Sequence, residues 1–495
     1  MNAIAKDLAP IPALKDSQLF KDRAYIDGAW VEADSRKRFD VDNPAEGTVL
    51  ASVPDMGAAE TRRAIEAANA ALPAWRALPA KERSRILRKW YELILANADD
   101  LALLLTTEQG KPLAEAKGEI AYGATFIEWF AEEAKRVYGD VIPSPTNDRR
   151  LLVIKQPIGV CAAITPWNFP NAMITRKVSP GLAAGCTFVL KPAEQTPFSA
   201  LALAELAERA GLPKGVLNIV TGDPVAIGQE VCANPLVRKV TFTGSTEVGR
   251  ILMRQSADTI KKLSLELGGN APFIVFDDAD LDAAAEGALA SKYRNAGQTC
   301  VCANRIYVQD SVYDAFAAKI AEKIRGLKVG KGTEPGVTIG PLIDAQGLAK
   351  VEEHVADAVS KGAKVVVGGK RHGLGGRFFE PTLLTEMKPE MKVAREETFG
   401  PVAPLFRFAN DKDAIALAND SEFGLCAYFY SRDIGRIFRA AESLEAGIVG
   451  VNVGIISTEV APFGGVKQSG LGREGSKYGI DEFLELKYIA LGGIQ

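Results

Sequence analysis

A cysteine in a small, polar segment is the first candidate for chemistry in this sequence. Cys300 follows Ala-Gly-Gln-Thr at 296–299, which itself follows a stretch predicted to be helical, 281–293. A thiolate is intrinsically very nucleophilic, but the thiol needs a lowered pKa or a nearby base. Gly297 lets another backbone or a ligand come close, because glycine has no Cβ. The segment predicts a nucleophilic Cys300, against the alternative of a buried structural cysteine.

Two more polar residues have surroundings suited to chemistry on a thiol. Glu266 lies in an apolar stretch just before Leu-Gly-Gly-Asn at 267–270. Burial there would raise the pKa of its carboxyl and suit it to act as a general base, with a buried, ion-paired glutamate as the alternative. Asn168, within Pro-Trp-Asn-Phe-Pro at 166–170, carries an amide that donates hydrogen bonds without titrating. Such a donor suits an oxyanion.

The scarcity of histidine excludes several other kinds of site. The chain holds only His354 and His372. A Ser-His-Asp triad, a histidine-rich zinc site and an HExxH helix therefore have little to work with, and no metal site is predicted. His354 lies in Glu-Glu-His-Val, a pattern typical of a solvated helix face, and His372 lies in a glycine-rich loop. Both are expected at the surface.

The composition is that of a multidomain globular protein. At 495 residues the chain is expected to hold two to four domains. A net charge of −3 gives no sign of binding to nucleic acid. Six cysteines in this length argue against a disulfide framework, and no apolar run approaches the roughly 18 residues of a membrane span. Residues 1–10 show no signal-peptide pattern, so the expectation is a cytoplasmic enzyme with no membrane partner.

The order of predicted elements indicates an α/β fold. Short β-type runs are predicted over 25–53, and amphipathic helices follow at 58–71, 81–97, 101–108 and 113–136. From residue 151 onward, short β-branched runs alternate with helical segments through to a final strand at 483–489. Such alternation predicts parallel sheets with helices on both faces, and nucleotides bind these sheets at the carboxyl ends of the strands.

Two sequence features fit a nucleotide at such strand ends. Gly244 and Gly249 follow a predicted strand and open a helix, but they form neither a G-x-G-x-x-G fingerprint nor a P-loop. A helix N-terminus there would offer free N–H groups to a pyrophosphate. Lys191 and Glu194 end an earlier strand and are spaced to reach one ribose, with a surface salt bridge as the alternative.

Five motifs in this order resemble the NAD(P)-dependent aldehyde dehydrogenase superfamily, over about residues 25–488. They are Pro-Trp-Asn-Phe-Pro (166–170), Lys-Pro-Ala-Glu (191–194), Phe-Thr-Gly-Ser (242–245), Leu-Glu-Leu-Gly-Gly-Asn (265–270) and Glu-Glu-Thr-Phe-Gly-Pro (396–401). The resemblance implies two parallel-sheet α/β domains, a small β oligomerisation arm and a homodimer or homotetramer. The implied parts are a Rossmann-like NAD-binding domain (20–137 and 158–267), a catalytic domain (268–476), the arm (138–157 and 477–495) and a loose N-terminal segment (1–19).

The resemblance also assigns roles to single residues. Cys300 attacks the aldehyde, Asn168 and the backbone N–H of Cys300 hold the oxyanion, and Glu266 activates the water that hydrolyses the thioester. The residues implied in binding the cofactor are Lys191 and Glu194 at the adenosine ribose, Gly244 and Ser245 at the pyrophosphate, Glu397 and Phe399 at the nicotinamide ribose, and Trp167 and Leu267. A carboxylate at Glu194 would repel a 2′-phosphate, so NAD is expected to be preferred, with NADP as a second cofactor.

The segments 295–305 and 463–475 resemble the succinate-semialdehyde dehydrogenases within that superfamily. By that resemblance, Arg176, Arg294 and Ser457 hold the carboxylate at the far end of the substrate. A guanidinium binds a carboxylate through two parallel hydrogen bonds, which fits this role. The alternative for each arginine is a structural salt bridge.

Three functions remain open from the sequence. Oxidation of succinate semialdehyde leads, and oxidation of glutarate semialdehyde is the alternative, because one methylene gives only about 1–3 kcal/mol of discrimination. A non-catalytic protein that keeps the fold is less favoured, because Cys300, Glu266 and Asn168 are all present. Cys302 is expected to point away from the substrate, with a regulatory disulfide to Cys300 as the less favoured alternative.

Overall fold

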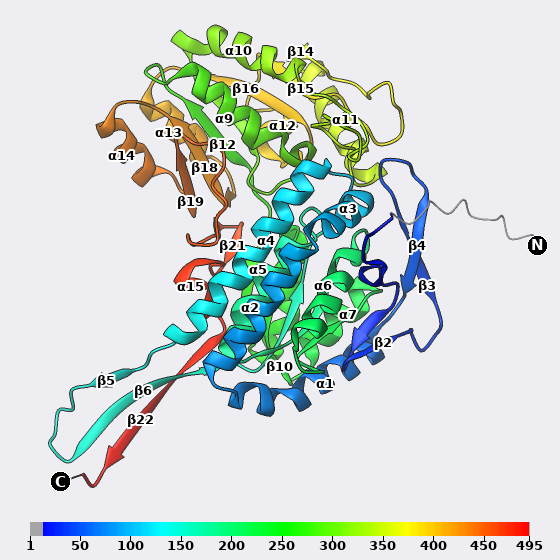
Figure 1. The fold of residues 1–495 in the computed structure, drawn as a ribbon. Coiled ribbons are helices and arrows are strands. Elements are labelled where there is room, and N and C mark those ends of the chain that lie inside the picture. The colour runs from blue at the N-terminus through cyan, green and yellow to red at the C-terminus, as the bar shows by residue number, and fades with distance from the viewer. Residues whose placement is uncertain (1–12, 495) are drawn as a thin grey trace, which may run out of the picture.

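Two sheets built mostly of parallel strands form the frame of the protein (Figure 1). The computed structural model describes residues 13–494. In the first sheet, the five central strands run parallel and the outer strands are antiparallel. Its order is β2 (Ala29–Val31), β1 (Ala24–Ile26), β9 (Leu217–Ile219), β8 (Thr187–Lys191), β7 (Val160–Ile164), β10 (Val237–Thr243), β11 (Lys262–Glu266) and β21 (Gly470–Leu471).

Strand register in the first sheet brings several predicted site residues to one edge. Lys191 pairs with Ile164, which pairs with Phe242, and Glu266 pairs with Thr243. Because these strands are parallel, their carboxyl ends meet at the same edge. Lys191, Gly244 and Glu266 therefore lie along the edge where the nucleotide was expected.

The second sheet lies above the first in Figure 1 and holds the segment after Cys300. All of its pairings are parallel except the one at β14. Pairing of Ala271 with Ala303 places the segment after Glu266 beside the segment after Cys300. The strand order is β14 (Lys364–Val367), β15 (Thr382–Thr385), β16 (Val402–Phe408), β13 (Ala303–Gln309), β12 (Ala271–Val275), β18 (Cys426–Tyr430) and β19 (Ile448–Val451).

Helices cover both faces of the first sheet. Phe188 and Leu190 of β8 pack into the core formed with α2 to α6, whereas Val189 between them packs into the core formed with α1 and α7. This alternation is what the strand period of two demands of a doubly covered sheet. These helices are α1 (Ala58–Ala77), α2 (Ala80–Ala96), α3 (Ala98–Gln109), α4 (Leu113–Glu133), α5 (Ala172–Ala184), α6 (Pro197–Ala210), α7 (Pro224–Ala233) and α8 (Thr246–Ser256).

The remaining helices follow α8 along the chain, and a separate hydrophobic core surrounds the second sheet. Within residues 13–494, no helix combines the length and apolarity needed to cross a membrane. The helices are α9 (Leu281–Tyr293), α10 (Tyr313–Arg325), α11 (Ala345–Ser360), α12 (Lys392–Arg395), α13 (Asp411–Asn419), α14 (Ile434–Ser443) and α15 (Ser476–Asp481).

A three-stranded antiparallel arm projects from the body of the protein and carries the C-terminus at its tip (Figure 1). It consists of β5 (Asp140–Ile142), β6 (Arg149–Pro157) and β22 (Leu484–Gly492). The pairing of β22 with β6 is continuous from Leu484↔Pro157 to Gly492↔Arg149. Two small pairs complete the sheets, β3 (Arg38–Asp42) with β4 (Val49–Pro54) and β17 (Phe423–Gly424) with β20 (Val466–Lys467).

Two expectations about surface segments were wrong. Residues 1–12 of the predicted loose N-terminal segment lie outside the described residues, but the segment 13–19 is anchored to the body of the protein. The backbone N–H groups of Lys15 and Asp16 donate to Asp100, and Leu19 is fully buried. His354 is also buried, because α11 lies against the segment that carries Thr398, whose hydroxyl is 3.1 Å from Nδ1 of His354.

Candidate active site

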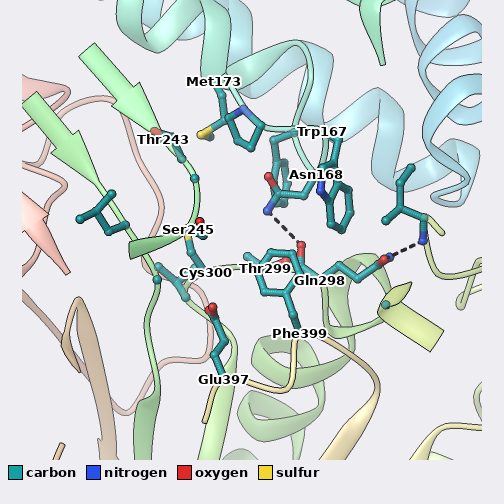
Figure 2. A pocket seen from close by; sticks show the side chains of 18 of the residues that line it. Trp167, Asn168, Met173, Thr243, Ser245, Gln298, Thr299, Cys300, Glu397 and Phe399 are labelled. Carbon is teal, nitrogen blue, oxygen red and sulfur yellow. Dashed lines mark hydrogen bonds between the residues drawn. The ribbon is translucent and has the colours of Figure 1, made fainter. Parts of the chain in front are cut away.

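One cavity of about 390 Å³ gathers most of the predicted site residues. Figure 2 shows labelled side chains from both sheets' edges around it, with the amide of Asn168 directed at the carbonyl of Gln298. Of the predicted residues, only Glu266, Lys191 and Glu194 are not part of its wall. The predicted residues that line it are Trp167, Asn168, Arg176, Gly244, Ser245, Leu267, Arg294, Cys300, Glu397, Phe399 and Ser457.

The loop before Cys300 has an unusual backbone. Asn295, Ala296 and Gly297 follow α9 and all have positive φ, at 53°, 55° and 77°. A Cβ on Gly297 would lie 2.1 Å from the carbonyl oxygen of Gly400, so this position requires glycine. The sequence had suggested such a close approach of another backbone at Gly297. Non-glycine residues in this conformation are strained and persist only when the surroundings hold them. The loop therefore holds Cys300 at the cavity wall by contacts with other elements.

Burial sets the protonation state of Cys300. It raises the pKa of the thiol to about 12, and the positive charge of Arg176 opposes this shift. At neutral pH Cys300 is therefore protonated, and its pKa is raised instead of lowered as a nucleophile requires. Cys302 is fully buried and is not part of the cavity wall, and both cysteines are free thiols. Cys302 therefore points away from the cavity, as expected.

Asn168 keeps a donor for the cavity. Its Nδ2 donates to the carbonyl oxygen of Gln298 at 3.0 Å. An amide nitrogen carries two hydrogens, so one hydrogen remains for an oxygen in the cavity. The carbonyl oxygen of Asn168 accepts from Nζ of Lys111 at 2.7 Å and from Nδ2 of Asn295 at 3.0 Å.

Glu266 is buried at the end of β11 and has an unsatisfied carboxyl group. Within the described residues, neither carboxyl oxygen has a hydrogen-bond partner. Burial, followed by the charge of Glu474, holds the pKa of Glu266 well above its usual range, as the sequence suggested. The ion-paired alternative is not what the structure contains. An unpaired buried carboxyl is costly, so its place beside the cavity wall calls for a functional reason.

The predicted cofactor residues fall into two groups. Gly244 and Ser245 stand at the N-terminus of α8, where Ser245 caps the helix by accepting from the N–H of Val248 at 3.3 Å. Lys191, almost fully buried, and Glu194 form an ion pair at the end of β8. Both groups lie along the carboxyl edge of the first sheet, where free N–H groups and paired polar side chains fit a dinucleotide.

The segment after α12 carries the residues predicted to hold the nicotinamide ribose. Glu397 accepts from the N–H of Gly269 at 3.2 Å, and burial raises the pKa of this carboxyl to about 7. The rings of Trp167 and Phe399 meet edge to face with centroids 5.5 Å apart. A buried carboxyl and two aromatic rings of this kind fit the ribose and ring of a nicotinamide.

The two arginines of the cavity differ in their surroundings. Nε of Arg176 lies 2.5 Å from Oε2 of Glu474, and the guanidinium lies over the ring of Phe463. The guanidinium of Arg294 lies 5.2 Å from the ring centroid of Phe169, and within residues 13–494 it forms no ion pair. Arg176 therefore forms the structural salt bridge, but within the described residues its Nη2 has no hydrogen-bond partner and it still lines the cavity, while Arg294 keeps its whole guanidinium for a ligand.

Sequence reasoning missed several residues of this site. Glu474 pairs with Arg176 and also with Lys177, whose Nζ lies 2.5 Å from Oε1. Glu474 lies in the segment 463–475, but no local sequence signal linked it to Arg176 and Lys177, almost 300 positions earlier. Gln346 and Lys350, in the first turns of α11, also line the cavity. A Gln and a Lys on an amphipathic helix carry no distinctive signal.

Comparison with known proteins places the chain in a family. Residues 30–489 match the aldehyde dehydrogenase family. The chain is 68% identical to a glutarate-semialdehyde dehydrogenase of Pseudomonas aeruginosa, over 97% of this chain and 100% of that protein. It is 68% identical to an NADP⁺ succinate-semialdehyde dehydrogenase of Escherichia coli, over 97% of this chain and 99% of that protein.

Solved structures point the same way. The crystal structure of an NADP-dependent enzyme of Escherichia coli superposes with a TM-score of 0.96 at 68% identity, over 97% of this chain and 100% of that one. The α/β fold with two parallel-rich sheets agrees with this likeness. The chain belongs to the aldehyde dehydrogenase family.

Proposed function

We propose that this protein oxidises succinate semialdehyde to succinate with NAD(P). The observation that carries the proposal is the convergence of Cys300, the amide of Asn168 and the cation Arg294, which has no ion pair among residues 13–494, on one cavity. Thiol and amide provide for aldehyde oxidation, and the arginine provides for a carboxylate at the far end of the substrate. The names of the similar proteins support the same substrate class.

The reaction proceeds in two halves. The Cys300 thiol gives its proton to water in the cavity, and its sulfur attacks the aldehyde carbon. The resulting oxyanion accepts hydrogen bonds from Asn168 and from the backbone N–H of Cys300. A dinucleotide held by Gly244, Ser245 and Glu397 would supply the hydride acceptor, and loss of the hydride would leave a thioester to Cys300. Glu266 then takes a proton from water, which attacks the thioester, and succinate leaves as the thiol is restored.

Glutarate semialdehyde is the second candidate substrate, favoured by the name of a relative that is equally similar. It is one methylene longer, and the same arginine would hold its carboxylate. A transferase that passes the acyl group to coenzyme A is disfavoured, because Glu266 provides a base for hydrolysis. The non-catalytic alternative is disfavoured by the intact nucleophile and oxyanion donor in the cavity.

The first test is absorbance at the NAD(P)H band with purified protein. Both cofactors are combined with succinate semialdehyde, glutarate semialdehyde and butanal. Strong turnover of the two oxo acids supports the proposal, and their ratio of kcat/KM ranks the two substrates. Equal turnover of butanal would remove the carboxylate-bearing substrate class and leave the dehydrogenase chemistry.

Replacement of Arg294 should separate charged from uncharged substrates. Arg294→Ala removes a charged hydrogen bond of about 1.5–3 kcal/mol, so kcat/KM for succinate semialdehyde should fall about 10- to 100-fold. For butanal, kcat/KM should change little, because butanal has no carboxylate to bind. The measurement is steady-state NAD(P)H formation with each aldehyde.

Arg294→Lys is the matched control. It keeps the charge but loses the planar fork, so its loss with succinate semialdehyde should lie between wild type and Arg294→Ala. A parallel fall for both aldehydes in Arg294→Ala would assign Arg294 to the structure of the cavity instead of to the substrate carboxylate.

Cofactor choice forms a second part of the proposal, with NAD preferred over NADP. Glu194 is 37% exposed and paired with Lys191, which leaves a carboxylate at the expected position of the ribose 2′-hydroxyl. Glu194→Ala should raise the ratio of kcat/KM for NADP to that for NAD about tenfold, because the repulsion of a 2′-phosphate is lost. An unchanged ratio would contradict this role of Glu194. The name of one relative contains NADP⁺, so the test must be made with both cofactors.

The arm supports a further part of the proposal, a homodimer or homotetramer in the cytoplasm. In a single chain, the strands of the arm leave large apolar side chains exposed to solvent: Val141 is 76% exposed, Leu486 is 71% and Tyr488 is 60%. Exposed apolar patches of this kind mark association surfaces. Light scattering of the purified protein reports the state, and a monomer would contradict this part.

A further inference from the structure

We infer that the buried ion pair between Lys111 and Glu119 positions Asn168 to hold the oxyanion. Lys111 and Glu119 are positioning residues that act through Asn168, and neither touches the substrate. The inference rests on the proposed function, which gives Asn168 the oxyanion. It extends that function to the part of the chain between α3 and α4, for which the sequence suggested only packing.

Lys111 reaches the Asn168 loop from the turn between α3 and α4. Its side chain is fully buried, and its Nζ lies 2.5 Å from Oε2 of Glu119. The same Nζ donates to the carbonyl oxygen of Asn168 at 2.7 Å and lies 3.9 Å from the ring centroid of Phe169. A single ammonium group therefore contacts the backbone of the donor residue and the side chain that follows it.

Glu119 holds the other end of the same loop. Its Oε1 accepts from the N–H of Asn171 at 2.9 Å and from that of Ala172 at 3.2 Å. These N–H groups stand at the start of α5, where a negative charge is favourable. The ion pair thus spans the loop from Asn168 to Ala172, and both ends are fixed to α4.

The loop that carries Cys300 is tied to the same place. Nδ2 of Asn295 donates to the carbonyl oxygen of Asn168 at 3.0 Å, and the N–H of Asn295 donates to Glu115 at 2.8 Å. Glu115 and Glu119 are one helical turn apart on α4. One helix face therefore sets the distance between the oxyanion donor and the nucleophile loop.

The cost of this arrangement argues against a purely stabilising role. Burial lowers the pKa of Lys111, which shows how unfavourable the charge is at this depth. A buried ion pair is often no more stabilising than apolar residues of similar volume. Its three directed contacts with one active-site loop instead fit a geometric function, because oxyanion donors act only when preorganised.

The test compares two reactions of Cys300 in Lys111→Met. Acylation, followed as the rapid burst of NAD(P)H with succinate semialdehyde, should slow at least about tenfold, since loss of an oxyanion donor costs about 10²- to 10³-fold. Alkylation by iodoacetamide should keep its rate, because displacement at a saturated carbon forms no carbonyl oxyanion. Glu119→Gln, which keeps the size of the side chain, should show the same split.

Lys239→Met is the matched control. Lys239 is also fully buried, and its Nζ lies 3.2 Å from Oε2 of Glu482 and 2.5 Å from Oγ of Ser264, near the start of β10. The Lys239→Met variant therefore loses a buried lysine ion pair that does not contact the loop carrying Asn168. The acylation burst of this variant should remain at the wild-type rate.

A double-mutant cycle with Asn168→Ala decides the inference. Because Lys111 acts through Asn168, Lys111→Met should slow acylation little further in the Asn168→Ala background. An equal loss in both backgrounds, or alkylation slowed as much as acylation, would overturn the inference. A wild-type burst in Asn168→Ala alone would instead refute the oxyanion role in the proposed function.

Discussion

Replacing Cys300 with alanine should abolish NAD(P)H formation with every aldehyde. No other group in the cavity can form the thioester, so kcat should fall by at least about 10⁴-fold, as for removal of other enzymatic nucleophiles. The fold should persist, because Cys300 is only partly buried and forms no disulfide. The measurements are NAD(P)H absorbance, with the thermal unfolding midpoint as a check on folding.

Cys302→Ala provides the control for that result. Cys302 lies two residues further, is fully buried and faces away from the cavity, with its Sγ 3.5 Å from the carbonyl oxygen of Lys292. Its loss should lower the unfolding midpoint more than the activity. Activity near the wild-type level in Cys300→Ala, or its loss in Cys302→Ala alone, would move the nucleophile away from Cys300.

Replacing Glu266 with glutamine should arrest the enzyme after the first half of the reaction. The amide cannot take a proton from water, so hydrolysis of the thioester should slow about 10²- to 10⁴-fold. Acylation does not use this base, so one equivalent of NAD(P)H per active site should still form. Rapid mixing would show the burst, followed by a slow steady state, and mass spectrometry would show the acyl group on the protein.

The raised pKa of Glu266 also predicts the pH dependence of the wild-type enzyme. Hydrolysis needs the carboxylate, and burial keeps the group protonated well above its usual range. The steady-state rate should therefore rise with pH as Glu266 loses its proton and fall off below that pKa, where the thioester accumulates. Glu266→Gln should lose this limb of the profile.

Two results would contradict the role of Glu266. A glutamine variant that keeps the wild-type steady-state rate would show that water is activated elsewhere. A variant that loses the burst together with the steady state would place Glu266 in the attack of Cys300. Added hydroxylamine, a nucleophile that needs less help from a base, should restore turnover only if the thioester is the species that accumulates.

Local patterns were sufficient for most of the elements. The helix predicted at 281–293 is α9 (Leu281–Tyr293), and the final strand predicted at 483–489 is β22 (Leu484–Gly492). Each depends on residues within a few positions, through side-chain period and β-branched content. The nucleophile Cys300 was also recognisable locally, because a small, polar, glycine-containing segment and a family motif surround it.

The neighbours of those residues were decided by the tertiary structure. Arg176 is paired with Glu474 and Lys111 with Asn168, pairings that join distant parts of the chain. His354 became buried because α11 is covered by a segment 44 residues away. Periodicity shows which helix face is polar, but not whether another element covers it.

The protonation states of Cys300 and Glu266 also depend partly on the sequence and partly on the tertiary structure. The sequence determined that a thiol and a carboxyl group are present at Cys300 and Glu266, and that both stand beside glycine-rich segments. Only the folded chain decided how deeply they are enclosed, and enclosure raises the pKa of each. The physical reason is that chemical identity is a property of one residue, whereas desolvation depends on all the atoms that exclude water from it.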